Sequence, residues 1–293
     1  MSPWIYILPL AAALTYVVSA LSLKRATDLG TGVWHTTFVS NLMAAVGFQV
    51  LLFFGGTWQP LSLWWQPFVV ALLFISGQLW ALLALQRGDV SISTPVLGLK
   101  VILVAGFVTL LSPEKLSWQM WLAAVLTTLG IASLNHSGAH RPGSNATGTI
   151  VAAALAAASF ALFDVLVQKW SPIWGLGRFL PIMVAMTGLL TLGLIPLFPS
   201  PISALPRPTR RWLLWGGALF ALQSIFLVSS IAYFGKATPA NVIYSSRGLW
   251  SILSITFLGH WFHSTEKTLD ASVMRWRFAG ASLMFAAIVL VLM

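Results

Sequence analysis

Ten stretches of mainly apolar residues, each about as long as a lipid bilayer is thick, run through this chain of 293 residues. They lie at about 3–23, 33–54, 64–86, 90–111, 117–136, 149–168, 174–197, 212–234, 238–261 and 273–292. A helix needs roughly 20 apolar residues to cross about 30 Å of hydrocarbon. An open sheet leaves backbone groups unpaired in lipid, and the stretches are too long and uniform for barrel strands. The sequence therefore predicts an all-α integral membrane protein with ten transmembrane helices.

The composition excludes most soluble classes of protein. Charged residues make up 8% of the chain and hydrophobic residues 58%, whereas about a quarter of the residues of a soluble domain are charged. The net charge of +10 fits basic loops that face the cytoplasm and anionic lipid, so we expect membrane lipid rather than nucleic acid as a partner. The chain has no cysteine, and its histidines form no group with a clear third ligand. We therefore expect no metal and no cofactor.

The two halves of the chain resemble each other. Gly88 precedes Lys100 by twelve residues, and Gly235 precedes Arg247 by twelve residues, so that the two segments are offset by 147 residues. We interpret residues 1–136 and 149–293 as two five-helix repeats that are joined by a polar linker at 137–148. Because five is an odd number, the second repeat enters the membrane from the opposite side. Inverted repeats are typical of secondary transporters, whose site lies near the midplane where the repeats meet.

The basic residues predict an orientation. Ten of them lie in or beside the odd-numbered connections, and at most four lie in the even-numbered ones. Basic connections stay in the cytoplasm, which places both termini outside. The expected location is the inner membrane of a bacterium.

Several short signals make the chain resemble the EamA-like ten-helix members of the drug/metabolite transporter superfamily. They are Lys24 and Lys169 at the ends of the first helix of each half, Arg178 early in the seventh helix, and the segments around Glu114 and Glu266. The resemblance implies alternating access through a central cavity lined by helices 1, 3, 4, 6, 8 and 9. It implies a substrate among amino acids, other metabolites, drugs, nucleotide sugars or sugar phosphates. The chain departs from this family at Thr15-Tyr16, where a Trp-Gly pair is common, and in its deep basic residues.

Lys100 and Arg247 are the strongest candidates for substrate binding. Each lies about ten residues into its apolar stretch, which is roughly 15 Å deep. A charge at the bilayer centre costs about 2.5 to more than 10 kcal/mol. An anionic substrate group would offset this cost, with Arg247 as a bidentate fork and Lys100 as a point charge. The alternative is that one or both pair with Asp164 or with backbone carbonyls and lock the bundle.

Three further ionisable residues are candidates for coupling or charge pairing. Asp164 is the one acid well inside an apolar stretch, where it serves as a proton carrier, a contact for a substrate amine, or an ion-pair partner of a nearby cation. His35 and Arg178 lie early in the second helix of each half. His35 takes part in coupling or is a hydrogen-bonded interface residue, and Arg178 has a role in the site or reaches the lipid headgroups.

Four uncharged residues complete the candidate substrate site. Gln78 and Gln223 lie near the middle of the third and eighth helices, and a buried amide must find a partner in a neighbouring helix or in a substrate. Tyr244 and Trp250 flank Arg247 at helical spacing, so we expect them to form an aromatic wall beside the cation.

These observations favour a secondary active transporter of a small organic solute, one that bears a carboxylate or a phosphate. The transporter would work by alternating access, coupled to a proton or a counter-substrate. Two alternatives stay open: an exporter of amino acids or amphipathic compounds, and a lipid-phosphate flippase. An intramembrane enzyme is disfavoured, because one intramembrane acid, scattered histidines and no cysteine do not supply a nucleophile–base set.

Overall fold

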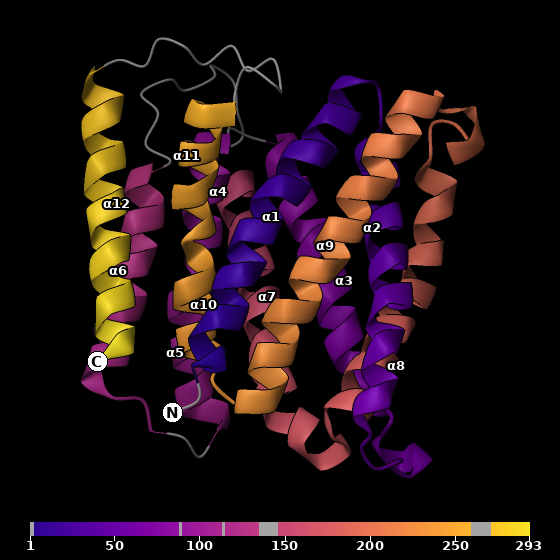
Figure 1. Ribbon diagram of the computed structural model, residues 1–293, viewed down its shortest axis with the longest axis horizontal. Coiled ribbons are helices and arrows are strands. Elements are labelled where there is room, and N and C mark those ends of the chain that lie inside the picture. Colours follow the sequence, from indigo (N-terminus) through magenta and orange to yellow (C-terminus); the bar gives the residue numbers. More distant parts are fainter. Residues whose placement is uncertain (1–2, 88–89, 113–114, 135–145, 259–270) are drawn as a thin grey trace.

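The computed structural model describes residues 3–87, 90–112, 115–134, 146–258 and 271–293. The described residues form helices joined by short connections, as expected of an all-α membrane protein (Figure 1). The α-helices are α1 (Trp4–Asp28), α2 (Val33–Gly47), α3 (Trp65–Arg87), α4 (Val90–Gly98), α5 (Lys100–Leu111), α6 (Trp118–Leu134), α7 (Ala146–Trp174), α8 (Leu176–Thr191), α9 (Arg207–Phe234), α10 (Ala237–Ser245), α11 (Arg247–Leu258) and α12 (Ala271–Leu292). Two 3₁₀ segments, η1 (Phe48–Phe54) and η3 (Leu192–Leu197), continue α2 and α8.

In the described part of the chain, eight helical segments are long and apolar enough to cross a bilayer, and α6 is a shorter apolar helix. The remaining expected stretch contains two short helices, α10 and α11. Helices occupy the described part of each expected apolar stretch, and their bounds agree within a few residues except at the end of α1, the end of α7 and the start of α9.

The ends of the first helix in each half were wrong in the sequence prediction. Lys24 and Lys169 are exposed residues inside helices, since α1 continues to Asp28 and α7 to Trp174. A single exposed charge does not end a helix. The connection between α7 and α8 is Gly175 alone, whose φ of 78° is accessible to glycine at little cost.

Residues 146–148 of the expected linker are helical, because α7 begins at Ala146. Residues 137–145, Gly88, Glu114 and Glu266 lie outside the described residues.

Small residues bring several helices close together. A Cβ on Gly280 of α12 would lie 2.7 Å from the carbonyl oxygen of Gly130 in α6. A Cβ on Gly216 of α9 would lie 2.7 Å from the Leu23 side chain of α1. Without a hydrophobic force between helices in lipid, such close backbone approach provides the packing. On α7 a face of alanines is buried, which places this helix in the interior of the bundle: Ala152, Ala153, Ala156, Ala157 and Ala161.

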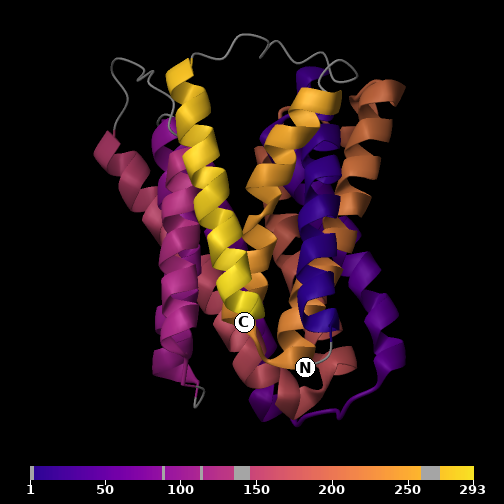
Figure 2. The same ribbon diagram turned by 60° about the vertical axis from the view of Figure 1, so that its left-hand side comes forward.

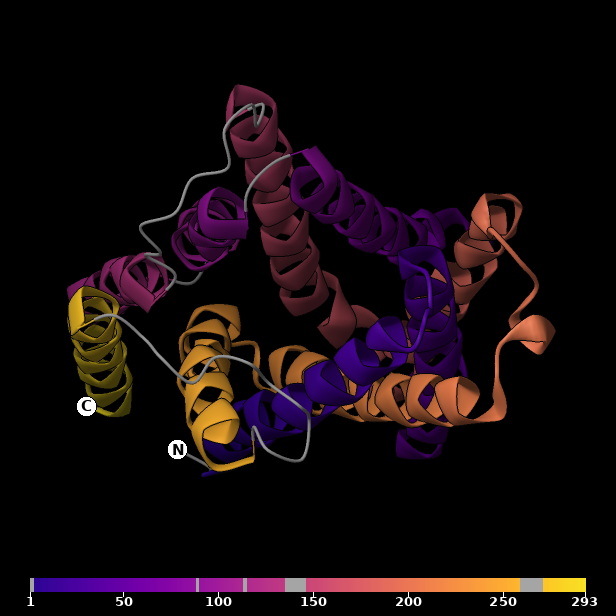
Figure 3. The same ribbon diagram turned by 90° about the horizontal axis from the view of Figure 1, so that it is seen from above.

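The helix contacts follow one pattern in both halves. The most extensive contacts join α1 with α9, α3 with α7, and α6 with α12. Suppose that α1 corresponds to α7, α3 to α9, and α6 to α12. The contact of α1 with α9 then corresponds to that of α7 with α3, and the contact of α6 with α12 corresponds to itself. Figures 1 and 2 show that α1 rises from the end of the bundle that holds both termini, whereas α7 descends toward it. Seen along the helices, α7 lies between α3 and the pair α10–α11, and α6 with α12 forms one edge (Figure 3).

Two helices are interrupted at matching places. The break between α4 and α5 falls at Leu99, and the break between α10 and α11 falls at Ser246, 147 residues later. At each break the amide donates a tight-turn hydrogen bond three residues back, from Leu99 to the Val96 carbonyl and from Ser246 to the Ile243 carbonyl, both 3.0 Å. Interrupted helices at corresponding positions are a common feature of transporter binding sites.

Candidate functional site

The two interruptions place Lys100 and Arg247 at the first positions of α5 and α11. Both side chains line a cavity of about 420 Å³ between the two broken helices, together with Tyr16 of α1 and Tyr244 of α10. The lining extends to Leu85 near the end of α3, Leu134 at the end of α6 and Arg277 near the start of α12. The ends of α3 and α6 and the start of α12 lie at the end of the bundle opposite the termini (Figure 1). The cavity therefore extends from mid-bundle toward one end.

Lys100 forms an ion pair on one wall of this cavity. Its Nζ lies 2.7 Å from Oδ2 of Asp164, and the Lys100 side chain is 20% exposed whereas that of Asp164 is 2% exposed. The same Oδ2 accepts a hydrogen bond of 2.7 Å from Asn241, whose amide also donates to the Ala237 carbonyl at 3.0 Å. The pairing of Lys100 with Asp164, which the sequence left open, is present, and it joins α5, α7 and α10.

Arg247 is held by aromatic groups instead of an acid. Its Nη1 donates a 2.8 Å hydrogen bond to the Tyr244 hydroxyl oxygen. Its guanidinium carbon lies 4.4 Å from the Tyr16 ring centroid and 4.5 Å from that of Tyr244, close enough for cation–π attraction. Among the described residues, no carboxylate lies within ion-pair distance of Arg247.

Gln223 forms a hydrogen bond with the tyrosine that contacts Arg247. The Tyr244 hydroxyl donates to Gln223 Oε1 at 2.8 Å, and the Gln223 amide donates to the Ser224 hydroxyl at 2.7 Å. Gln223 is buried in α9 and is not among the cavity-lining residues. It therefore orients Tyr244, which in turn orients Arg247.

Trp250 does not form the expected wall beside Arg247. It is partly buried, packs against the main apolar core and is not among the cavity-lining residues. The expectation assumed one continuous helix from Tyr244 to Trp250, whereas the helix is interrupted at Ser246 between them, so regular helical spacing does not relate the two side chains.

The structure leaves Gln78 outside the cavity. Gln78 and Asn41 exchange hydrogen bonds of 2.8 and 2.9 Å, and Asn41 also donates to Thr191 at 3.0 Å. This network joins α2, α3 and α8.

His35 and Arg178 also lie away from the cavity. His35 Nε2 is 2.7 Å from the Ser200 carbonyl oxygen. Arg178 donates to the Leu52 carbonyl at 3.2 Å and lies over the Trp58 ring at 5.0 Å. Because α2 and α8 start at opposite ends of the bundle (Figure 1), these two residues are also far from each other.

Sequence reasoning missed two residues of this site. Tyr16 provides one of the two rings that contact Arg247. The sequence feature that could have identified it is Thr15-Tyr16, where the family commonly has a Trp-Gly pair. Asn241 binds Asp164, and its signal was a polar amide within an apolar stretch. Of the two repeat-related cations Lys100 and Arg247, which both line the cavity, Asp164 forms an ion pair with Lys100, and Arg247 has no carboxylate within ion-pair distance among the described residues.

Comparison with known proteins agrees with this architecture. A solved structure described as "Crystal structure of protein" aligns with a TM-score of 0.72 over 98% of this chain and 96% of that chain, at 14% sequence identity. This similarity shows a shared fold. No curated protein matches the sequence. The model of the EamA-like transporter family matches residues 3–135, which confirms the resemblance found in the sequence. The first half of the chain is therefore similar to the EamA-like transporter family, and this similarity implies an integral membrane transporter of small solutes.

Proposed function

We propose that this chain is a secondary active transporter of a small solute that bears a carboxylate or phosphate, and that this group binds Arg247. The observation that carries the proposal is the Arg247 guanidinium on the wall of a 420 Å³ cavity, with no carboxylate partner among the described residues. A guanidinium has several N–H donors in a planar fork, and Tyr244 accepts one of them. The other donors are suited to a bidentate anion.

The cost of a buried charge supports an anionic substrate. A cation far from bulk water needs a compensating partner, and cation–π contacts with Tyr16 and Tyr244 supply only about 0.5–2 kcal/mol each. A substrate anion would supply the rest. Arg247 would therefore be more stable with its substrate bound than alone, which favours loaded over empty reorientation of the carrier.

Alternating access is the mechanism that the arrangement favours. The exchanging helix contacts and the breaks at Leu99 and Ser246 support two inverted repeats, within residues 1–136 and 149–293. Between the cavity and the end that holds the termini, an apolar cluster packs α5 and α10 against α6 and α12: Val101, Ala105, Ala123, Ala124, Val242, Ile243, Ala287 and Val291. We propose that this cluster closes the pathway while the opposite end gives access.

The Lys100–Asp164 pair is the proposed coupling element. Protonation of Asp164 would weaken its ion pair with Lys100. Lys100 would then be a second cation, beside Arg247, that can bind the substrate. The groups around Asp164 are Lys100 and Asn241, with Arg247 and Tyr244 nearby on the same cavity wall. A counter-substrate that competes with Asp164 for Lys100 would give exchange in place of proton coupling.

The orientation of the chain also stays a proposal. Both termini lie at one end of the bundle (Figure 1). The start of α9, which contains Arg207, Arg210 and Arg211, lies at the other end. The positive-inside rule then places the termini outside the inner membrane of a bacterium.

The test is counterflow in liposomes that contain the purified protein. A panel of radiolabelled dicarboxylates, sugar phosphates and amino acids is first ranked by thermal stabilisation of the protein and then assayed for uptake. Arg247→Gln should abolish uptake of the best solute, and Arg247→Lys should retain part of it with a higher KM. Unchanged uptake by Arg247→Gln would exclude Arg247 as the binding residue.

The same assay separates the two alternatives. An exporter of amino acids would need Asp164 to accept the substrate ammonium, a place that Lys100 occupies in this structure. That exporter would rank zwitterions above purely anionic solutes. A lipid-phosphate flippase would instead move headgroup-labelled lipid between leaflets.

A further inference from the structure

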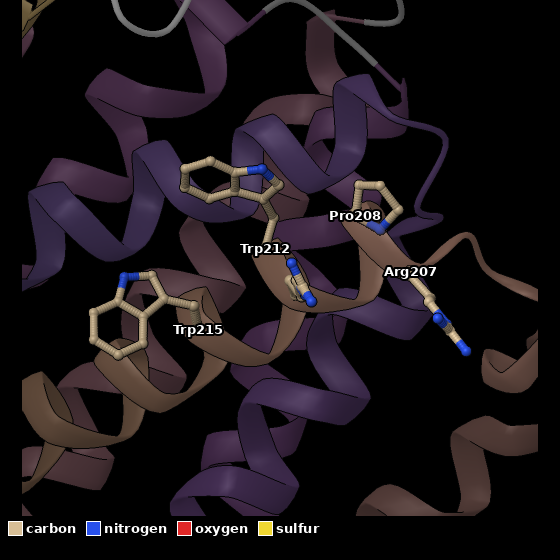
Figure 4. A pocket seen from close by; sticks show the side chains of 5 residues that line it. Arg207, Pro208, Trp212 and Trp215 are labelled. Atoms are coloured by element: carbon tan, nitrogen blue, oxygen red, sulfur yellow. The ribbon is translucent and has the colours of Figure 1, made fainter.

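The start of α9 presents a groove that shares no residue with the proposed transport site. Arg207, Pro208, Arg211, Trp212 and Trp215 line this surface groove, whose volume is about 610 Å³. Figure 4 shows Arg207 and Pro208 at the beginning of the helix and the Trp212 and Trp215 rings projecting from its following turns. Arg207, Arg211 and Trp215 follow at spacings of four residues and therefore share one face of α9.

The two arginines of the groove are uncompensated. Arg207 and Arg211 are exposed, and no carboxylate lies within ion-pair distance of either among the described residues. Like charges at i and i+4 repel each other, so both gain from a shared anion. Arg210, in the same turn, is a third cation but does not line the groove.

Beyond the arginines, the exposed surface of α9 becomes apolar. Leu214, Trp215 and Leu222 are 47%, 59% and 40% exposed, as expected for a surface that contacts acyl chains. Tryptophan is enriched at the level of the lipid headgroups, and Trp212 and Trp215 lie between the arginines and the rest of the helix. The groove thus lies where charged headgroups meet hydrocarbon.

We propose that this groove binds an anionic phospholipid. Arg207 and Arg211 hold the headgroup phosphate by charge-assisted hydrogen bonds, the indoles of Trp212 and Trp215 contact the glycerol region, and an acyl chain lies along Leu222. A soluble anion would use the arginines but leave the aromatic and apolar part of the groove empty. Charge complementarity together with the apolar continuation of the groove therefore favours a lipid.

The experiment measures lipid binding to the full-length protein in neutral detergent by native mass spectrometry and by the thermal unfolding midpoint. The probes are short-chain phosphatidylglycerol, phosphatidylcholine of the same chain length, and inorganic phosphate. The variants are Arg211→Gln and Arg210→Gln, which remove the same charge from adjacent positions inside and outside the groove. Trp215→Leu removes the aromatic ring and keeps an apolar side chain.

We expect phosphatidylglycerol to bind and to raise the unfolding midpoint, and phosphatidylcholine and inorganic phosphate to do so much less. Arg211→Gln should lower the apparent affinity for phosphatidylglycerol about fivefold, the loss expected for one basic residue at an anionic surface. Arg210→Gln should change it by less than half as much, and Trp215→Leu should weaken it while charge is unchanged. Equal losses in Arg210→Gln and Arg211→Gln, or equal stabilisation by inorganic phosphate, would overturn the proposal. Because no groove residue lines the transport cavity, either result leaves the proposed transport function standing.

Discussion

Lys100 of α5 and Asp164 of α7 form an ion pair of 2.7 Å between Nζ and Oδ2, and this pair joins the two halves of the chain beside the proposed substrate cavity. Arg247, which begins α11 as Lys100 begins α5, has two tyrosine rings in place of an acid. Two cations that each follow a helix break therefore have different surroundings. The first is neutralised within the protein, and the second is available to a ligand.

Removing the carboxylate of this pair should destabilise the protein. Loss of one partner from a fully buried pair costs about 3–5 kcal/mol, and because Lys100 is 20% exposed we expect about 1–3 kcal/mol for Asp164→Asn. The double variant Lys100→Gln, Asp164→Asn should recover part of this loss, because no charge is then left alone. The measurement is the thermal unfolding midpoint in detergent. Additive effects of the two single substitutions would show that the pair contributes no coupling energy.

The Tyr244 hydroxyl should matter for substrate affinity through Arg247. Tyr244→Phe removes the oxygen that accepts from Arg247 and the proton donated to Gln223, and it keeps the ring. A lost hydrogen bond to a charged group costs about 1.5–3 kcal/mol, so we expect KM to rise at least tenfold, measured as counterflow into liposomes. Tyr233→Phe is the matched control, since Tyr233 is 73% exposed on α9. Equal KM values for both variants would contradict this role of Tyr244.

The contact of α6 with α12 should depend on glycine. In Gly280→Ala the new Cβ would lie 2.7 Å from the Gly130 carbonyl oxygen, so the helices must separate. Overpacking of this kind costs about 1–3 kcal/mol. Gly106→Ala is the control, because a Cβ there has no neighbour within 4 Å and alanine favours helix by about 1 kcal/mol. Thermal unfolding should show a lower midpoint for Gly280→Ala and an unchanged or higher one for Gly106→Ala.

The helices were predictable from sequence because apolar length is a local property. The stretches at 33–54, 64–86 and 90–111 agree closely with the helices and 3₁₀ segments of the structure. The ends at Lys24 and Lys169 were wrong, because hydropathy falls at a charge whereas the helix ends where the backbone must turn, as at Gly175. The break at Leu99 was not predicted, since no single residue at that position requires it.

The site was predictable as a set of residue types but not as a set of contacts. The deep positions of Lys100 and Arg247 follow from counting along apolar stretches. Which of them Asp164 neutralises depends on how α7 crosses α5, and that crossing is set by packing across the whole bundle. Trp250 was misplaced because the helical pattern was extended across the interruption at Ser246. Gln78 was misplaced because a mid-helix amide has the same sequence signal whether its partner is another helix or a solute.

The absence of cysteine from the sequence allows the cavity to be tested for water directly. Ser251→Cys introduces a thiol on the cavity wall, and Leu189→Cys introduces one on a surface residue of α8 that is 67% exposed. The cysteine thiolate is the nucleophile that attacks a maleimide, and it forms in water but not among acyl chains. A membrane-impermeant maleimide should therefore modify Ser251→Cys and leave Leu189→Cys unmodified, and a transported solute should slow the modification.

The reagent should act from the side that carries Arg207 and Arg211, which the basic residues assign to the cytoplasm. Modification of Ser251→Cys from the opposite side of the membrane would contradict either the assigned orientation of the chain or the end at which the cavity is proposed to open. Labelling of a tag at the C-terminus gives the orientation by itself and so distinguishes these two cases.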